Sequence, residues 1–265
     1  MSLADAIVAH VLRLETALYH ARARLEAGTD GEALHDLRIA VRRLRSLLRP
    51  LRGKEGVVAL EQAAAAVGEL TTPARDLEVL IEQLRKRGLL APASSRAARL
   101  MASHEEILRS PVLQQLFDRL AAWPADLRLA QRQGELRRLD GLLNKRLGKL
   151  KVRLQDALAD PQHDPHRLRL LVKRNRYAQE AYPQHSPISA DGVLALKAVQ
   201  GALGRWHDRY QWCLRASQEA DLQPLREQWK SEAVEALQKA EGKLLLLTDA
   251  LAAKAKDRRR TKGNL

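Results

Sequence analysis

Apolar residues recur along most of the chain at intervals of three and four positions, the spacing of one face of an α-helix. The first run ends near Gly28, and its apolar positions are Leu3, Ile7, Val11, Leu14, Leu18 and Leu25. The second run spans residues 35–52, and its apolar positions are Leu37, Val41, Leu44, Leu48 and Leu51. Ala, Leu, Arg, Glu and Gln dominate the composition, which favours helix almost throughout. The pattern therefore predicts an all-α protein.

The opposite side of the second run carries a row of basic side chains. His35, Arg38, Arg42, Arg45 and Arg49 follow one another at spacings of three and four, so at about 100° per residue they share one helix face. The row extends over about 21 Å and contains no acid. A solvated helix face is the ordinary interpretation of a charge run. Solvated faces usually mix acids and bases, however, and a bound anion is the alternative that offsets the repulsion.

The row occurs a second time in the later half of the chain, where His166 aligns with His35. Seven of eleven positions agree when Arg and Lys are counted as equal, and the matching residues are His166, Leu168, Arg169, Val172, Lys173, Arg174 and Arg176. Glu180 takes the place of Arg49, so the second row is shorter. A repeat of about half the chain length predicts two related halves. We assign them to residues 1–123 and 124–253, with the second half beginning at Pro124.

Prolines, glycines and capping residues divide the chain into further helices. Ser110 and Asp164 each precede a proline that suits the first position of a helix. We expect helices at 55–70, 73–87, 93–109, 111–122, 125–158, 189–204, 206–219 and 222–253. Residues 254–265 carry six Lys or Arg and one acid, and we expect them to form a basic, disordered tail.

The motif His-x-Leu-Arg-x-x-Val-(Arg/Lys)-Arg-x-Arg, present twice, resembles the CHAD domain, the conserved histidine α-helical domain. A second family element follows each motif further along the chain, as Arg75–Asp76 and as His207–Asp208. His207 departs from the Arg or Asn expected there. The resemblance covers about residues 5–250 and implies an all-α protein of two helical bundles that binds inorganic polyphosphate. We expect two related antiparallel bundles around a pseudo-twofold axis, with the two rows lining one central basic channel.

The chemistry of the two rows suits a chain of phosphates. Arginine offers a planar fork of donors that matches phosphate oxygens, and a long row of forks suits a linear polyanion better than a single phosphate. We expect the arginines to lower the pKa of the row histidines, and a bound polyphosphate to raise it. Asp76 and Asp208 are expected to orient arginines. The predicted polyphosphate-binding residues are His35, Arg38, Arg42, Arg43, Arg45, Arg49, Arg75, His166, Arg169, Lys173, Arg174, Arg176, Tyr177 and His207.

Charge and composition limit the other possibilities. The net charge is +14, so the partners should be anionic. Cys213 is the single cysteine, which excludes an internal disulfide and any multi-Cys metal site. The sequence has no Gly-rich phosphate loop and no nucleophile with a local signature. We therefore expect no catalytic residues, no cofactor and no metal, and we interpret the protein as a non-enzyme.

Two alternatives to polyphosphate binding stay open. One is nonspecific binding to the backbone of nucleic acid, in part through the basic tail, although aromatic residues are only 3% of the chain and leave little for bases to stack on. The other is a role as scaffold or accessory to a separate phosphate-metabolising enzyme. No apolar run has membrane-spanning length. We expect a cytoplasmic protein without membrane association, located at polyphosphate granules, and the sequence gives no oligomeric state.

Overall fold

The computed structural model describes residues 2–54 and 56–262, with side chains up to residue 252. Within these residues the secondary structure is helical and contains no strand, which confirms the all-α class. No helix in this part of the chain is long and apolar enough to cross a membrane. The chain divides into two compact units, Met1–Leu142 and Leu143–Leu265.

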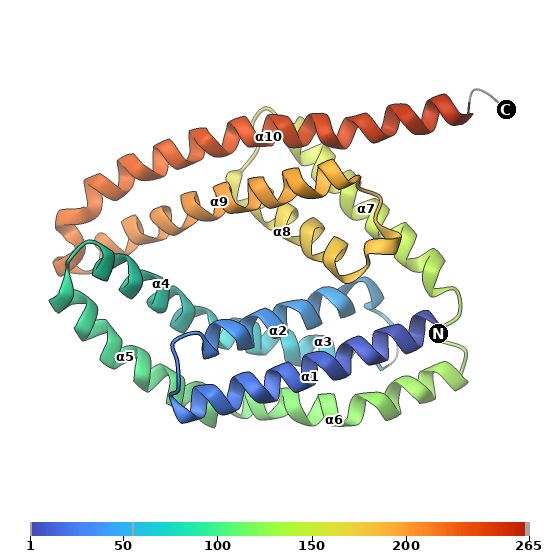
Figure 1. The fold of residues 1–265 in the computed structure, drawn as a ribbon, viewed down its shortest axis with the longest axis horizontal. Coiled ribbons are helices and arrows are strands. Elements are labelled where there is room, and N and C mark those ends of the chain that lie inside the picture. The colour runs from blue at the N-terminus through green and yellow to red at the C-terminus, as the bar shows by residue number, and fades with distance from the viewer. Residues whose placement is uncertain (1, 55, 263–265) are drawn as a thin grey trace. The chain divides into compact units, whose positions relative to one another are not determined.

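The first unit contains the helices α1 to α6, coloured from blue to green in Figure 1. Helix α2 packs against α1 and α3, α3 packs against α6, and α4 packs against α5. The elements are α1 Leu3–Ala27, α2 Ala33–Leu48, the 3₁₀ turn η1 Arg49–Leu51, α3 Val58–Leu70, α4 Thr72–Lys86, α5 Leu90–Arg109 and α6 Pro111–Arg132.

The core of the first unit confirms the predicted apolar side of α2. Leu37, Leu44 and Leu48 are 0% exposed, and Val41 and Leu51 are no more than 2% exposed. Burial of each such side chain stabilises the fold by about 1.5–3 kcal/mol. The rotation of α2 about its axis is therefore fixed by this side, and the basic row is directed away from the apolar core.

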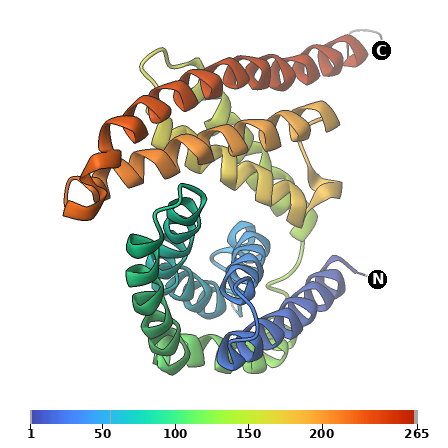
Figure 2. The same ribbon diagram turned by 60° about the vertical axis from the view of Figure 1, so that its left-hand side comes forward.

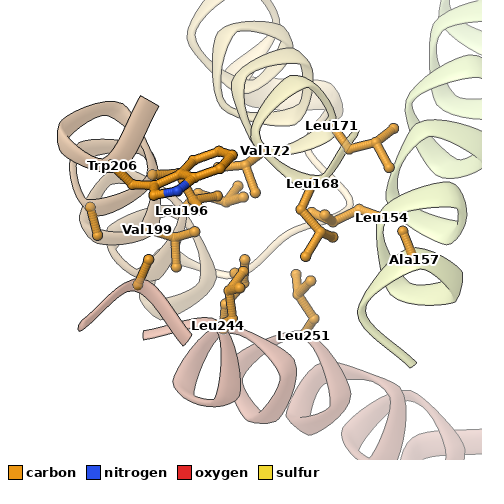
Figure 3. Close-up of a cluster of buried hydrophobic side chains, with 14 of the residues drawn as sticks. Leu154, Ala157, Leu168, Leu171, Val172, Leu196, Val199, Trp206, Leu244 and Leu251 are labelled. Carbon is orange, nitrogen blue, oxygen red and sulfur yellow. The ribbon is translucent and has the colours of Figure 1, made fainter. Parts of the chain in front are cut away.

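The second unit places a long helical pair over two shorter helices. Helix α10 runs beside α9 (Figures 1 and 2), and α8 packs against α9. The elements are α7 Leu139–Ala159, α8 Pro165–Ala181, the 3₁₀ turn η2 Pro183–His185, α9 Ala190–Ala216, the 3₁₀ turn η3 Ala220–Leu225 and α10 Arg226–Lys262. All four α-helices contribute to one buried cluster (Figure 3), which includes Leu154, Leu168, Val172, Leu196, Val199, Trp206, Leu244 and Leu251.

Local capping signals in the sequence are confirmed. Gly28 ends α1 in the left-handed conformation, with φ at 61°, which glycine adopts without steric cost. The Ser110 hydroxyl accepts a hydrogen bond from the backbone N–H of Val112. The Asp164 carboxylate accepts hydrogen bonds from the N–H groups of His166 and Arg167, so it fixes the first turn of α8, where the second row begins.

The predicted boundary at Pro124 is wrong. Pro124 lies inside α6, because a proline inside a helix removes one N–H donor and can bend the helix without ending it. The predicted helix 125–158 is instead interrupted at 133–138, where Gly134 adopts a φ of 79° and Arg138 a φ of 59°. The two units divide after Leu142, close to the start of α7.

Two other predictions differ from the structure. The break expected between 204 and 206 is absent and α9 is continuous, since Gly204 costs only about 1 kcal/mol relative to Ala and α9 packs on both sides. Helix α10 continues to Lys262, through the segment for which the sequence predicts disorder. Its alanine and lysine residues are strong helix formers. The final part of that predicted tail, 263–265, lies outside the described part of the chain.

Candidate polyanion-binding site

In the first unit, α2 and α4 bring basic groups together. We call His35, Arg38, Arg42 and Arg75 the first cluster. His35 is half-buried; burial lowers its pKa, and the positive charges of Arg75 and Arg42 lower it further. The charge of Arg75, which lies on a different helix from the row, therefore acts on the first residue of the row.

Arg38 is held at the junction between α3 and α4. Its Nη1 donates to the Thr71 hydroxyl at 2.6 Å, and to the Gly68 carbonyl and the Thr72 hydroxyl, both at 3.2 Å. Burial lowers the pKa of the Arg38 guanidinium, and the charge of Asp76 opposes this effect. Asp76 thus acts electrostatically on an arginine of the row; its orienting role stays a prediction.

Glu78 holds Arg75, the arginine that α4 adds to the cluster, in place. Arg75 Nη1 lies 2.9 Å from Glu78 Oε2, while His104 Nε2 on α5 lies 3.5 Å from Glu78 Oε1. The Glu78 side chain is only 10% exposed, so this carboxylate fixes Arg75 between α4 and α5. The sequence analysis missed Glu78, although its position one helical turn after Arg75 is the spacing of an ion pair.

The later members of the first row have different surroundings. The Arg45 guanidinium lies against Gly68, where an added Cβ would come within 2.7 Å of Nη1, and Arg45 Nε is buried without a hydrogen-bond partner among the described residues. Arg49 is half-buried in η1. Arg43 is exposed and its charge acts on His10 of α1, whose pKa is lowered chiefly by burial. Arg43 therefore faces α1 and lies apart from the row.

The acid that follows His35 on α2, Asp36, forms an ion pair with an arginine of α1. Asp36 Oδ2 accepts from Arg24 Nη1 at 2.7 Å, and Arg24 also forms an ion pair with Asp30 at 2.6 Å. These contacts tie α2 to the end of α1. The charge of Asp36 still acts on the row, because it opposes the lowering of the pKa of His35 by burial and by Arg75.

In the second unit, α8 and α9 form the equivalent arrangement. We call His166, Arg169, Lys173 and His207 the second cluster. The pKa of His207 is lowered to about 4 by burial and by the charges of Arg169, His166 and Lys173. The two imidazole rings lie 5.5 Å apart, and His207 Nδ1 is buried without a partner in the described part of the chain. The departure at His207 from the family pattern thus keeps a titratable group in this cluster.

Aromatic rings surround His166, which the sequence analysis did not anticipate. The imidazole centroid lies 4.5 Å from Trp206 and 5.0 Å from Tyr210. Trp206 is buried and Tyr210 is exposed. Their spacing of four positions on α9, with His207 between them, is the signal that could have identified this group.

The far end of the second row is occupied by protein contacts. Arg176 forms an ion pair with Glu180 and donates to Gln200 Oε1 on α9 at 3.0 Å. Tyr177 is buried, and its hydroxyl accepts from Gln200 Nε2 at 3.1 Å. Tyr177, predicted from the sequence to bind polyphosphate, is therefore packed against α9 and not exposed on the surface of α8. Arg174 is exposed and Asp208 is half-buried.

Other kinds of site are not found among the described residues. No group of three or more His, Cys, Asp or Glu side chains in this part of the chain is arranged to hold a metal ion. A groove of about 270 Å³ lies between α3 and α6, and its lining residues are Ala59, Gln62, Ala63, Ala66, Gln115 and Arg119. It contains no member of either cluster.

Comparison with known proteins assigns the family. A model of the CHAD domain matches residues 11–217, a range that includes both rows and both Asp-containing pairs. The chain belongs to the CHAD family. The crystal structure of the CHAD domain from the plant Ricinus communis is 28% identical, with a TM-score of 0.61, and the match covers 96% of this chain and 91% of that chain.

A second CHAD-like fold is found in PptA from Streptomyces chartreusis. It has a TM-score of 0.62 and 19% sequence identity, and the match covers 91% of this chain and 98% of that chain. At this identity the likeness concerns the fold alone. A search of curated proteins finds no match. The CHAD assignment confirms the family resemblance of the sequence.

Proposed function

We propose that this CHAD protein binds inorganic polyphosphate and does not catalyse a reaction on it. The observation that carries the proposal is the repetition of one arrangement in both units. In each unit a basic row on one helix is joined by a basic or titratable side chain from another helix, Arg75 of α4 in the first and His207 of α9 in the second, and electrostatic effects link that side chain to the row. The family resemblance implies the same ligand.

The charges of the two clusters favour an extended polyanion. Like charges within one cluster repel each other, and after burial, the larger cause, they lower the pKa values of His35 and His207 further. Phosphate oxygens would offset that repulsion, and arginine donates to them in a fork-like geometry. A linear chain carries a charge at each phosphate and can follow a helix face for several turns. Polyphosphate therefore fits the rows better than a single small anion.

The cellular consequence we propose is association with polyphosphate granules, because a protein that binds the polymer accumulates where the polymer is stored. The predicted central channel stays a prediction. Nonspecific binding to nucleic acid is the competing function, since DNA also presents a regular phosphate backbone.

The test is a titration at fixed ionic strength, about 0.15 M salt. The ligands are pyrophosphate, tripolyphosphate, long polyphosphate and double-stranded DNA, at equal phosphate concentration. We expect the affinity per molecule to rise with polyphosphate length and to exceed the affinity for DNA. Equal affinity for pyrophosphate and long chains would contradict the proposal, and tighter binding of DNA would favour the competing function. Release of orthophosphate from the bound chain would contradict the non-catalytic part.

A further inference from the structure

The second row ends differently from the first. Arg176 is enclosed by Glu180, one turn further along α8, and by Gln200 of α9. Its guanidinium also lies over the ring of Tyr177, at 5.3 Å from the centroid. The donors of Arg176 are thus directed to groups of the protein, and its charge is balanced by a carboxylate within the same helix.

The counterpart of Arg176 in the first row has neither of these partners. Arg45 aligns with Arg176 when the two rows are superposed from their first histidines, and Gly68 aligns with Gln200 when Asp76 is superposed on Asp208. Where Gln200 accepts a hydrogen bond, Gly68 has no side chain. Where Glu180 supplies a negative charge, the first row continues with Arg49. The two rows therefore differ at the same end, through two substitutions.

Stability does not explain why a glutamate occupies position 180. The residue lies in the last turn of α8, where a negative charge is unfavourable to the helix dipole. An Arg that precedes Glu at a spacing of four is the weaker orientation of a helical ion pair. The pair is also partly exposed, with Glu180 at 42%, so it contributes little to folding. A role in ligand binding accounts for the position better.

We infer that Glu180, together with Gln200, ends the second cluster by holding Arg176 away from the ligand, so that the second unit binds only a short segment of polyphosphate. The inference rests on the proposed function. From His166 to Lys173 the cluster spans about 10 Å at 1.5 Å per residue, about half the length of the first row. Short polyphosphates and single stretches of a longer chain are the ligands that such a cluster accepts.

The test removes the Glu180 carboxylate and compares polyphosphate affinity with that of a control variant that loses a carboxylate on another helix. Glu180→Ala releases Arg176 from its ion pair and extends the second row by one charged group. Glu235→Ala is the control, because Glu235 also pairs at a spacing of four, with Lys239 on the exposed side of α10. Both variants change the net charge equally. Glu180→Arg is a second variant, and it gives α8 the residue type that Arg49 supplies to the first row.

Isothermal titration calorimetry measures the affinity of the wild type and of each variant for long polyphosphate and for tripolyphosphate. We expect Glu180→Ala to bind long polyphosphate about tenfold more tightly than Glu235→Ala, which corresponds to about 1.4 kcal/mol. Glu180→Arg should bind it at least as tightly, and tripolyphosphate affinity should stay within twofold for both variants.

Two results would overturn the inference. One is the same long-chain affinity, within twofold, for Glu180→Ala and Glu235→Ala. The other is an equal gain for tripolyphosphate, which would indicate a general charge effect. In both cases the wild type still binds polyphosphate and the proposed function stands. Failure of the wild type to bind any polyphosphate contradicts the proposed function itself. Thermal melting of each variant verifies that the helices are intact.

Discussion

The two units carry related basic rows, but the helices that pack beside those rows differ. In the first unit the row of α2 faces two helices, α3 and α4, which meet at Thr71; in the second unit the row of α8 faces one continuous helix, α9. When the two Asp-containing pairs are superposed, Val67 aligns with Val199, and both are fully buried. The apolar contacts are therefore kept, while the course of the backbone beside the row differs.

This difference changes what each row can do. The junction of α3 and α4 supplies a carbonyl and two hydroxyls that hold Arg38, whereas α9 has Leu203 and Gly204 at the positions of the two threonines. In the second unit, α9 instead supplies aromatic rings beside His166 and the acceptor Gln200. The comparison indicates that the placement of basic groups is the common property of the units, and that the supporting contacts are not.

The largest expected effect comes from introducing a helix break into α9, at the position where α3 gives way to α4 in the first unit. Pro73 of α4 aligns with Arg205 of α9, which lies in the helix interior. Arg205→Pro should lower the free energy of unfolding by about 3 kcal/mol, because proline removes a backbone donor and clashes with the preceding turn. Arg205→Ala, at the same exposed position, should change it by less than about 0.5 kcal/mol. Urea unfolding followed by circular dichroism measures both, and a loss below about 1 kcal/mol for the proline variant would show that α9 tolerates the break.

A smaller effect is expected of pH on polyphosphate affinity. It distinguishes His207, which titrates, from its counterpart Arg75, which stays charged. In the ligand-free protein the pKa of His207 is lowered to about 4, so stability falls as pH decreases from about 6.5 towards 4. Bound phosphates raise this pKa, so the complex binds more protons than the free protein and affinity rises as pH falls through the pKa of the complex. Between pH 7.5 and 5.5 we expect a gain of roughly five- to tenfold.

Titrations at several pH values measure this linkage. In His207→Gln the gain should be reduced, whereas Arg75→Gln should weaken binding and keep the pH dependence, since arginine stays charged at all these values. An unchanged pH profile in His207→Gln would contradict the assignment of the proton to the second cluster.

The smallest expected effect tests the surroundings of Arg45. Gly68→Ala places a Cβ at 2.7 Å from Arg45 Nη1, so the flexible guanidinium has to move, while the helix gains up to about 1 kcal/mol in propensity. We expect polyphosphate affinity to fall two- to threefold with no loss of thermal stability. Gly204→Ala is the control, because nothing lies within 4 Å of its added Cβ. Equal affinities for the two variants would contradict a role of Gly68 in seating Arg45.

The sequence alone was sufficient for the elements whose signals are local. The spacing of Leu37, Val41 and Leu44 determined the buried side of α2, and Ser110 and Asp164 marked helix starts through hydrogen bonds to the next few residues. The positions where one helix ends and the next begins could not be derived in the same way. A helix that contains Pro124 or Gly204 continues or ends according to the packing of its neighbours, and that packing depends on residues distant in sequence.

The site was predictable to a similar extent. The repeat identified the row helices, and the family element brought in Arg75 and His207. The periodicity of α8 could not show that Arg176 and Tyr177 both contact Gln200, because Gln200 lies on a different helix, α9. Arg43 lies apart from the row for a simpler reason. It follows Arg42 directly, and one residue is a rotation of about 100° around the helix, enough to direct Arg43 to α1.

The most direct test of the account is calorimetric titration of long polyphosphate into four proteins. These are the wild type, Arg42→Ala/Arg45→Ala in the first row, Arg169→Ala/Lys173→Ala in the second cluster, and the control Arg13→Ala/Arg43→Ala. The control removes two exposed charges that act on His10, on the other side of α2.

Each charge-assisted hydrogen bond contributes about 1.5–3 kcal/mol. We therefore expect each of the two test variants to bind long polyphosphate at least 100-fold more weakly than the wild type. The affinity of the control variant should change by less than threefold. If either test variant binds polyphosphate as tightly as the control does, the row that it removes is not part of the binding site, and the account is wrong for that unit.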